Sequence, residues 1–290
     1  MEMKRLTERV YMTGHDHATD RPALGAIVGE RATLIVDSGN SAAHARLFLE
    51  QLAAVPGAEP RYLALTHWHW DHVFGAAEMD LTTIAHPLTQ QKLRQMQSYR
   101  WDDAALQERV QTGEEIAFCA ENIIKEHPGA LRESIAIRPA DILYDGRMTV
   151  DLGGVTCEIF SLGGEHSADS TAVYCPQEQV LFLGDGMCQE MFEGPWSYDL
   201  PDYEARLQKI EGLPCKWYVN AHWDPQNADD FARAAAQMRA LGKLVGAETD
   251  GARVYAQYRR QYGAEPDEAA REILDSYLWG NRKRGRQPLR

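Results

Sequence analysis

Short apolar runs separated by turn-forming residues recur along the chain and predict β-strands. The first two, Leu24–Val28 and Ala32–Val36, are separated by Gly29 and Glu30, a pair typical of a turn. Similar runs continue to residue 220. The expected strands are Leu24–Val28, Ala32–Val36, Arg61–Thr66, Leu81–Ala85, Thr149–Leu152, Val155–Ser161, Thr171–Tyr174, Val180–Leu183 and Trp217–Asn220.

Three segments lack this pattern and predict helices instead. Ala42–Ala54 follows a group of residues that can cap a helix. Residues 88–133 are rich in Gln, Glu, Arg, Leu and Ala and predict two or three helices. Residues 228–278 predict further helices, broken near Gly246 and at Gly263–Pro266.

Two mostly β halves with flanking helices predict an α/β sandwich, in which two sheets pack together and helices cover them. We expect one domain over residues 1–290. Within it, residues 88–133 would form a helical insertion and residues 228–290 a helical C-terminal extension.

The charge of the chain argues against some classes of partner. An excess of acidic residues gives a net charge of −13, whereas binding to nucleic acid or anionic membranes requires a basic surface. Basic residues cluster near the end, at Arg282–Arg284 and Arg286, where we expect a solvated tail. We therefore expect a small-molecule substrate.

The cysteines and the N-terminus indicate a cytoplasmic protein. The chain has five cysteines, none in a CxxC pair, which favours reduced thiols over a disulfide framework. The N-terminus lacks the apolar stretch of a signal peptide, and no apolar segment reaches the roughly 18 residues of a transmembrane helix.

Metal-ligand side chains gather directly after the expected strand that ends at Thr66. His67, His69, Asp71 and His72 fall within six residues. Residues i and i+2 of an extended chain point to the same side, so His67 and His69 can bind one ion together. Asp71 and His72 follow where the chain leaves the strand and can turn toward a second ion. Imidazole and carboxylate ligands suit zinc, manganese or iron.

Three later segments each add a ligand at or near the end of an expected strand. His166 lies in a glycine-containing loop, Asp185 ends an apolar run, and His222 follows another. Because functional side chains often sit on loops held by a rigid scaffold, these residues are candidates for the same site.

Together, the motifs resemble those of the metallo-β-lactamase superfamily. They are His-x-His-x-Asp-His at 67–72, Gly-Glu-His-Ser-x-Asp-Ser at 164–170, Phe-Leu-Gly-Asp at 182–185 and Asn-Ala-His at 220–222. The resemblance implies a four-layer αβ/βα sandwich with two divalent metal ions, zinc first and manganese or iron as alternatives. It also implies that His67, His69 and His166 bind the first ion, that Asp71, His72 and His222 bind the second, and that Asp185 bridges both.

Position 185 carries an aspartate, whereas the best-known zinc β-lactamases carry a cysteine there. In this respect the chain resembles the glyoxalase II and lactonase branch. The resemblance therefore implies a hydrolase of a small ester, thioester or lactone that uses a hydroxide bridging the two metals, with Asp71 orienting it or moving its proton. A phosphodiesterase and a mononuclear iron dioxygenase remain alternatives, because ligand identity does not determine metal identity. A homodimer is also possible.

Other polar residues near the motifs have more than one interpretation. Asp37 and Asp169 could orient ligand imidazoles, or could equally be turn or capping residues. For the cluster that runs from His15 through His17 to Asp20, a polar loop is favoured over a substrate contact. We expect a plain buried thiol at Cys188, core packing for Trp68 and Trp70, and ordinary polar roles for His86 and His127. The apolar stretch that contains Met187, Met191, Phe192, Trp196 and Tyr198 predicts loop packing, or the lining of an apolar acyl or aryl pocket.

Overall fold

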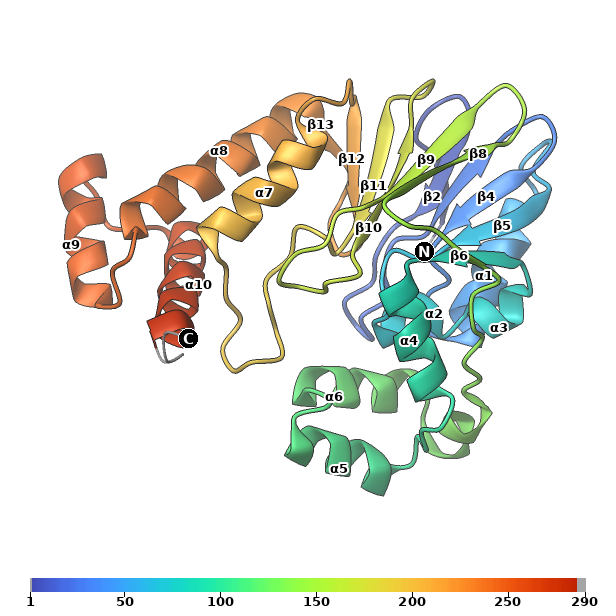
Figure 1. Ribbon diagram of the computed structural model, residues 1–290, viewed down its shortest axis with the longest axis horizontal. Coiled ribbons are helices and arrows are strands. Elements are labelled where there is room, and N and C mark those ends of the chain that lie inside the picture. The colour runs from blue at the N-terminus through green and yellow to red at the C-terminus, as the bar shows by residue number, and fades with distance from the viewer. Residues whose placement is uncertain (1, 286–290) are drawn as a thin grey trace.

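The computed structural model describes residues 2–285 and contains two β-sheets that face each other (Figure 1). The first sheet has seven strands in sequence order, antiparallel from β1 to β4 and parallel from β4 to β7. Its strands are β1 (Met3–Arg5), β2 (Val10–Thr13), β3 (Gly25–Val28), β4 (Thr33–Val36), β5 (Pro60–Ala64), β6 (Thr82–Ala85) and β7 (Ile142–Leu143).

The second sheet has six strands in the order β13-β12-β11-β10-β9-β8. Only β11 and β12 run parallel, because the helix α7 (Leu200–Ile210) connects them, and the other neighbours are antiparallel. Its strands are β8 (Arg147–Asp151), β9 (Thr156–Ser161), β10 (Thr171–Cys175), β11 (Val180–Gly184), β12 (Trp217–Asn220) and β13 (Gln226–Asn227).

Alternating side chains on the strands separate the core into three layers. In β4, Leu34 and Val36 pack between the two sheets, whereas Ile35 packs against helices on the outer face. In β11, Phe182 points between the sheets and Leu181 points outward. This period of two shows that each sheet buries both of its faces.

Helices cover the two outer faces, so the molecule has four layers, as the family resemblance implies (Figure 1). The first sheet is covered by helices of its own half together with the expected insertion, and the second by α7, α8 and α10. The helices are α1 (Ala42–Leu52), α2 (Trp70–Val73), α3 (Ala76–Met79), α4 (Pro87–Met96), α5 (Asp103–Thr112), α6 (Ala117–Glu126), α7 (Leu200–Ile210), α8 (Ala228–Val245), α9 (Gly251–Tyr262) and α10 (Glu268–Gly285).

The observed elements agree with most of the expected ones. The segment 88–133 contains α4 to α6 and a 3₁₀ helix at Gly129–Ser134, and the breaks in the C-terminal helices fall at Gly246 and Gly263, as expected. The strands β1, β2, β7 and β13 were not expected. Of these, β1, β7 and β13 have only two or three residues, too few for an alternating pattern to stand out.

The basic cluster near the C-terminus is not simply a solvated tail. In α10, Lys283 pairs with Glu190, and Arg284 lies 3.0 Å from Asp199, so the helix is held against the second sheet's loops. Arg286 lies outside the described residues. Within residues 2–285, no helix combines the length and apolar character needed to cross a membrane.

Candidate metal centre

The seven expected ligands all lie at one end of the sandwich, where strands of both sheets end. The first sheet contributes the residues that follow β5, and α2 begins directly after His69, so its first turn carries two ligands. The second sheet contributes the β9–β10 loop and the ends of β11 and β12. In chain order the residues are His67, His69, Asp71, His72, His166, Asp185 and His222.

Backbone contacts bring these strand ends close together. The amide of Thr171 donates to the carbonyl of Thr66 across the two sheets at 2.8 Å, and the amide of Ala221 donates to the carbonyl of Gly184 at 3.0 Å. Gly184 has a φ of 52°, and a Cβ there would lie 2.4 Å from Thr66 Oγ1. A side chain at position 184 would therefore push the end of β11 away from the end of β5.

The seven side chains form two adjacent groups of possible metal ligands. In each group, one ligand atom per residue lies within 4.8 Å of all the others: His67, His69 and His166 form the first group, and Asp71, His72, Asp185 and His222 form the second. Asp185 Oδ2 faces both groups. Its distance to Nε2 is 4.0 Å for His67, 3.5 Å for His166, 3.5 Å for His72 and 3.4 Å for His222.

A buried carboxylate orients His72. Asp37 Oδ2 accepts a hydrogen bond from His72 Nδ1 at 2.8 Å, which leaves Nε2 turned toward Asp71 and Asp185. Asp37 also accepts hydrogen bonds from the amide of Thr66 at 2.7 Å and from its hydroxyl at 2.8 Å. The expected orienting role of Asp37 fits this geometry.

The other expected orienting residue, Asp169, does not contact His166. Its carboxylate accepts hydrogen bonds from Ser167 and Thr89 and supports the loop instead. His166 Nδ1 lies 2.8 Å from the backbone carbonyl of Gln189, which holds the ring. No sequence signal pointed to Gln189, because a backbone carbonyl is available at every residue.

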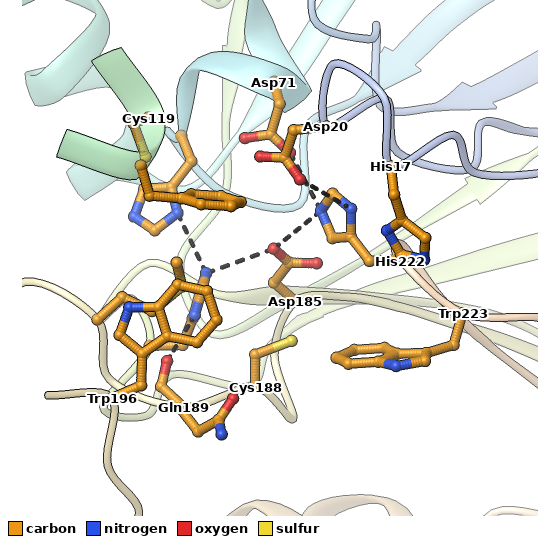
Figure 2. A pocket seen from close by; sticks show the side chains of 14 residues that line it. His17, Asp20, Asp71, Cys119, Asp185, Cys188, Gln189, Trp196, His222 and Trp223 are labelled. Carbon is orange, nitrogen blue, oxygen red and sulfur yellow. Dashed lines mark hydrogen bonds and ion pairs between the residues drawn. The ribbon is translucent and has the colours of Figure 1, made fainter. Parts of the chain in front are cut away.

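Asp20 lies beside His222, so the polar loop that carries it reaches the edge of the site. Asp20 Oδ1 is 3.4 Å from His222 Nδ1 (Figure 2). The residues on either side of Asp20 are both tied to Glu126 at the end of α6: Thr19 Oγ1 donates to it at 2.6 Å, and Arg21 pairs with it at 2.7 Å. The insertion is thus linked to the site through Asp20.

Buried polar atoms without hydrogen-bond partners point into the space between the ligands. Within the described residues they include His67 Nε2, His72 Nε2, Asp71 Oδ2 and Asp185 Oδ1. A buried polar atom left unpaired costs free energy, so such a set requires an explanation. Imidazole nitrogens and carboxylate oxygens that converge in this way fit divalent cations.

The charges of the site also suit cations. Burial lowers the pKa of His67 well below its usual value, so this imidazole stays neutral. Burial opposes charge on His72 and His222 too, but the facing carboxylates of Asp71 and Asp185 outweigh it and raise the pKa of both rings well above normal. Divalent cations would replace these protons, because metal binding requires neutral imidazoles.

The two ligand groups lie at the floor of a cavity of about 260 Å³ (Figure 2). His17, in the polar loop, lines this cavity, and so does Cys188, which is buried as expected. Burial raises the pKa of the Cys188 thiol well above normal, so the thiol is neutral at pH 7. No motif or pattern pointed to Phe118, Cys119 and Trp223, which also line the cavity.

The two tryptophans between the ligands differ in position. Trp70 is buried in the core, as expected. Trp68 is only partly buried and packs beside His69, with ring centroids 4.7 Å apart, so it forms part of the surroundings of the site. Phe192 contacts both Trp68 and His69, and its ring centroid is 5.3 Å from that of His69.

The geometry agrees with a comparison against known families. A family model described as the Metallo-beta-lactamase superfamily matches residues 24–222, which is more than half of the chain. The chain belongs to the metallo-β-lactamase superfamily. The matched range begins just before β3 and ends at His222, so it includes all seven candidate ligands.

Two curated relatives are similar to parts of this superfamily member. An atrochrysone carboxyl ACP thioesterase from Aspergillus fumigatus is 25% identical over 183 residues, covering 63% of this chain and 44% of the relative. A hydroxyacylglutathione hydrolase from Ruegeria pomeroyi is 27% identical over 195 residues, covering 65% of this chain and 58% of the relative. The chain thus spans about half the length of these curated relatives.

Solved structures share the fold at low sequence identity. A metallo-beta-lactamase from Pontibacter korlensis has a TM-score of 0.56 at 16% identity, covering 81% of this chain and 97% of that one. The stereoselective inverting sec-alkylsulfatase Pisa1 from Pseudomonas sp. has a TM-score of 0.63 at 14% identity and covers 100% of this chain and 52% of its own. At this identity the likeness concerns the superfamily fold alone, which confirms the expected fold class.

Proposed function

We propose that this chain is a dinuclear metal-dependent hydrolase of small esters, thioesters or lactones. One observation carries the proposal: the Asp185 carboxylate lies between two groups of buried ligands at the floor of a cavity. A shared carboxylate between two cation sites is a common arrangement for hydrolysis.

The proposed roles follow from where each side chain lies. His67, His69 and His166 would hold one divalent ion, Asp71, His72 and His222 would hold the other, and Asp185 would contact both. Divalent ions bound there would lower the pKa of water and polarise an acyl carbonyl oxygen. Zinc fits the ligand set best, with manganese and iron as alternatives.

The protein's own groups would then orient the reactants. Asp71 Oδ2 lies 3.0 Å from His72 Nε2 and 3.2 Å from His222 Nε2, and Asp71 also lines the cavity. It would accept a hydrogen bond from the attacking water and hold that water against the acyl carbon. The contacts of Asp37 and of the Gln189 carbonyl would keep His72 and His166 in the required orientation.

An ester or thioester substrate is supported by two observations. The bridging position is occupied by Asp185, as in the glyoxalase II and lactonase branch that the sequence resembles. The two curated relatives are named as a thioesterase and a hydroxyacylglutathione hydrolase. We therefore assign the chain to this branch as part of the proposal.

A substrate panel on zinc-loaded protein tests the function. Methyl and p-nitrophenyl esters, an acyl thioester, a lactone and bis-p-nitrophenyl phosphate would be compared, with oxygen consumption measured in parallel on iron-loaded protein. We expect turnover of acyl substrates, and its loss in Asp185→Asn. The matched control is Asp151→Asn, which changes an exposed aspartate distant from the ligands. Turnover of the phosphodiester alone, or oxygen consumption without hydrolysis, would contradict the proposal.

A further inference from the structure

Exposed aromatic side chains gather around the cavity above the ligands. Among the described residues, four Phe, Tyr or Trp side chains are classed as exposed, and three of them line this cavity. Phe118 is 38% exposed, Trp196 is 40% exposed and Trp223 is 50% exposed. The fourth, Tyr262, lies at the end of α9, outside the cavity. Large apolar groups concentrated at one cavity mark a binding surface rather than chance exposure.

These three residues come from separate parts of the chain, so no single loop explains their meeting. Phe118 is the second residue of α6 in the insertion, Trp196 lies in the segment between β11 and α7, and Trp223 follows β12. The rings of Phe118 and Trp196 meet edge to face, with centroids 5.4 Å apart at 90°. In the view of Figure 2, the two indole rings lie on either side of Cys188.

The charged groups of the cavity are all negative apart from the histidines. Asp20, Asp71 and Asp185 line it, and no lysine or arginine does so among the described residues. Cations in the neighbourhood have other partners: Arg21 pairs with Glu126 at 2.7 Å. With divalent ions bound, Asp71 and Asp185 would be ligands, so Asp20 is the carboxylate left facing the cavity. A substrate that carries a carboxylate remote from the scissile bond would find no cationic side chain to pair with there and would meet Asp20.

The size of the cavity limits the group that can enter. Its volume of about 260 Å³ lies just below the roughly 300–1,000 Å³ typical of ligand pockets. A single ring fits this space better than a polycyclic group, and flat aromatic faces such as those of Trp196 favour a flat partner.

We propose that the site selects an ester or thioester whose group in the cavity is an uncharged single aromatic ring adjacent to the scissile bond. The inference rests on the proposed function and narrows its substrate class. In the reaction, water oxygen bonds to the acyl carbon and the bond from that carbon to the alcohol oxygen or thiol sulfur breaks. The acid is released as a carboxylate; one proton of the water goes to the departing oxygen or sulfur, and the other is released to solvent.

Matched esters test the selection on the zinc-loaded full chain. Methyl phenylacetate carries the ring on the acyl side and benzyl acetate carries it on the leaving side, which distinguishes the two placements. Methyl butyrate supplies a neutral aliphatic comparison and monomethyl succinate an anionic one. We expect kcat/KM for at least one aromatic ester to exceed that for methyl butyrate by about tenfold or more, with monomethyl succinate lowest.

Variants connect the selection to the aromatic residues. Trp196→Ala and Phe118→Ala should lower the aromatic-to-butyrate ratio of kcat/KM by about tenfold, whereas the control Tyr262→Ala should leave that ratio unchanged. Binding gives a readout that does not need turnover: the ring protons of phenylacetamide, a neutral amide, should broaden in NMR spectra with wild-type protein and much less with Trp196→Ala.

The outcomes separate this inference from the proposed function. Equal kcat/KM for the aromatic, aliphatic and anionic esters, or ratios unchanged in the Trp196 and Phe118 variants, would overturn the inference while leaving the hydrolase function intact. No turnover of any ester or thioester by metal-loaded protein would overturn the function. In that case phenylacetamide binding alone decides whether the cavity accepts a neutral ring.

Discussion

Replacing Asp37 by asparagine tests how the protein prepares His72 for a metal. An ionised carboxylate only accepts hydrogen bonds, so Asp37 Oδ2, 2.8 Å from His72 Nδ1, requires the proton on Nδ1, so Nε2 is the nitrogen whose proton a cation would replace. In Asp37→Asn, an amide NH₂ facing Nδ1 favours the opposite tautomer, which places a proton on Nε2. Asparagine tolerates the φ of 60° at this position, so backbone strain does not explain the effect.

The expected magnitude follows from the lost contacts. Disturbing a partner that orients a metal-bound histidine costs about 10–100-fold in metal affinity, or about 1.4–2.7 kcal/mol. The amide oxygen can still accept from the amide of Thr66, but the bonds from the Thr66 hydroxyl and from His72 are compromised. Because hydrogen bonds to charged groups contribute about 1.5–3 kcal/mol each, we expect metal-free protein to lose about 2–4 kcal/mol of unfolding free energy.

Two measurements check this prediction. Competition with a chromogenic chelator gives the zinc affinity, and urea denaturation in EDTA gives the stability of the metal-free protein. The matched control is Asp80→Asn, because Asp80 also has a positive φ of 48° but is exposed and paired with Arg138 at the surface. We expect the control to change stability by less than about 1 kcal/mol. Wild-type zinc affinity and wild-type stability in Asp37→Asn would refute the reasoning.

Two further changes have distinct expected results. Burial raises the pKa of Glu115 from 4.5 to about 7, so the folded chain keeps a proton that the unfolded chain releases. The unfolding free energy should therefore fall as pH rises from about 4.5 to about 7. Glu115→Gln should be about 3 kcal/mol more stable than wild type at pH 8 but not at pH 4. Urea denaturation at both pH values checks this, and an equal gain in stability at both would contradict it. A Cβ at Gly75 would lie 2.0 Å from the carbonyl oxygen of Ser38, whereas one at Gly212 meets nothing within 4 Å. Thermal denaturation should show Gly75→Ala destabilised by about 1–3 kcal/mol and Gly212→Ala near wild type, and equal melting temperatures would exclude close packing at Gly75.

The sequence predicts the parts of the site that depend on local order. His67 and His69 follow a buried strand at a spacing that places both on one side, and Asp185 and His222 end apolar runs, so their approach follows from strand ends meeting at one edge. The strands β10 and β11 are predicted within a residue because they are continuous apolar runs with both faces buried.

Contacts between distant segments escape such reasoning. Asp20 faces His222 across 202 positions of sequence, and only the folded sheets bring them together. For Asp169, sequence left open an imidazole-orienting role and a turn role, and the contact with Ser167 two residues away favours the turn role, because sequence proximity to His166 does not determine where a loop side chain points. The ring contact between Phe118 and Trp196 depends on how the insertion packs against the rest of the domain, which the helical composition of the insertion does not indicate.

The number of ions bound per chain tests the central claim most directly. Protein loaded with zinc, dialysed and analysed by inductively coupled plasma mass spectrometry should contain two ions per folded chain. His222→Ala should contain about one, because this change removes a ligand from only one of the two groups. Wild-type protein that retains less than half an ion per chain, or a folded His222→Ala that still retains two, would contradict a centre built from these seven side chains.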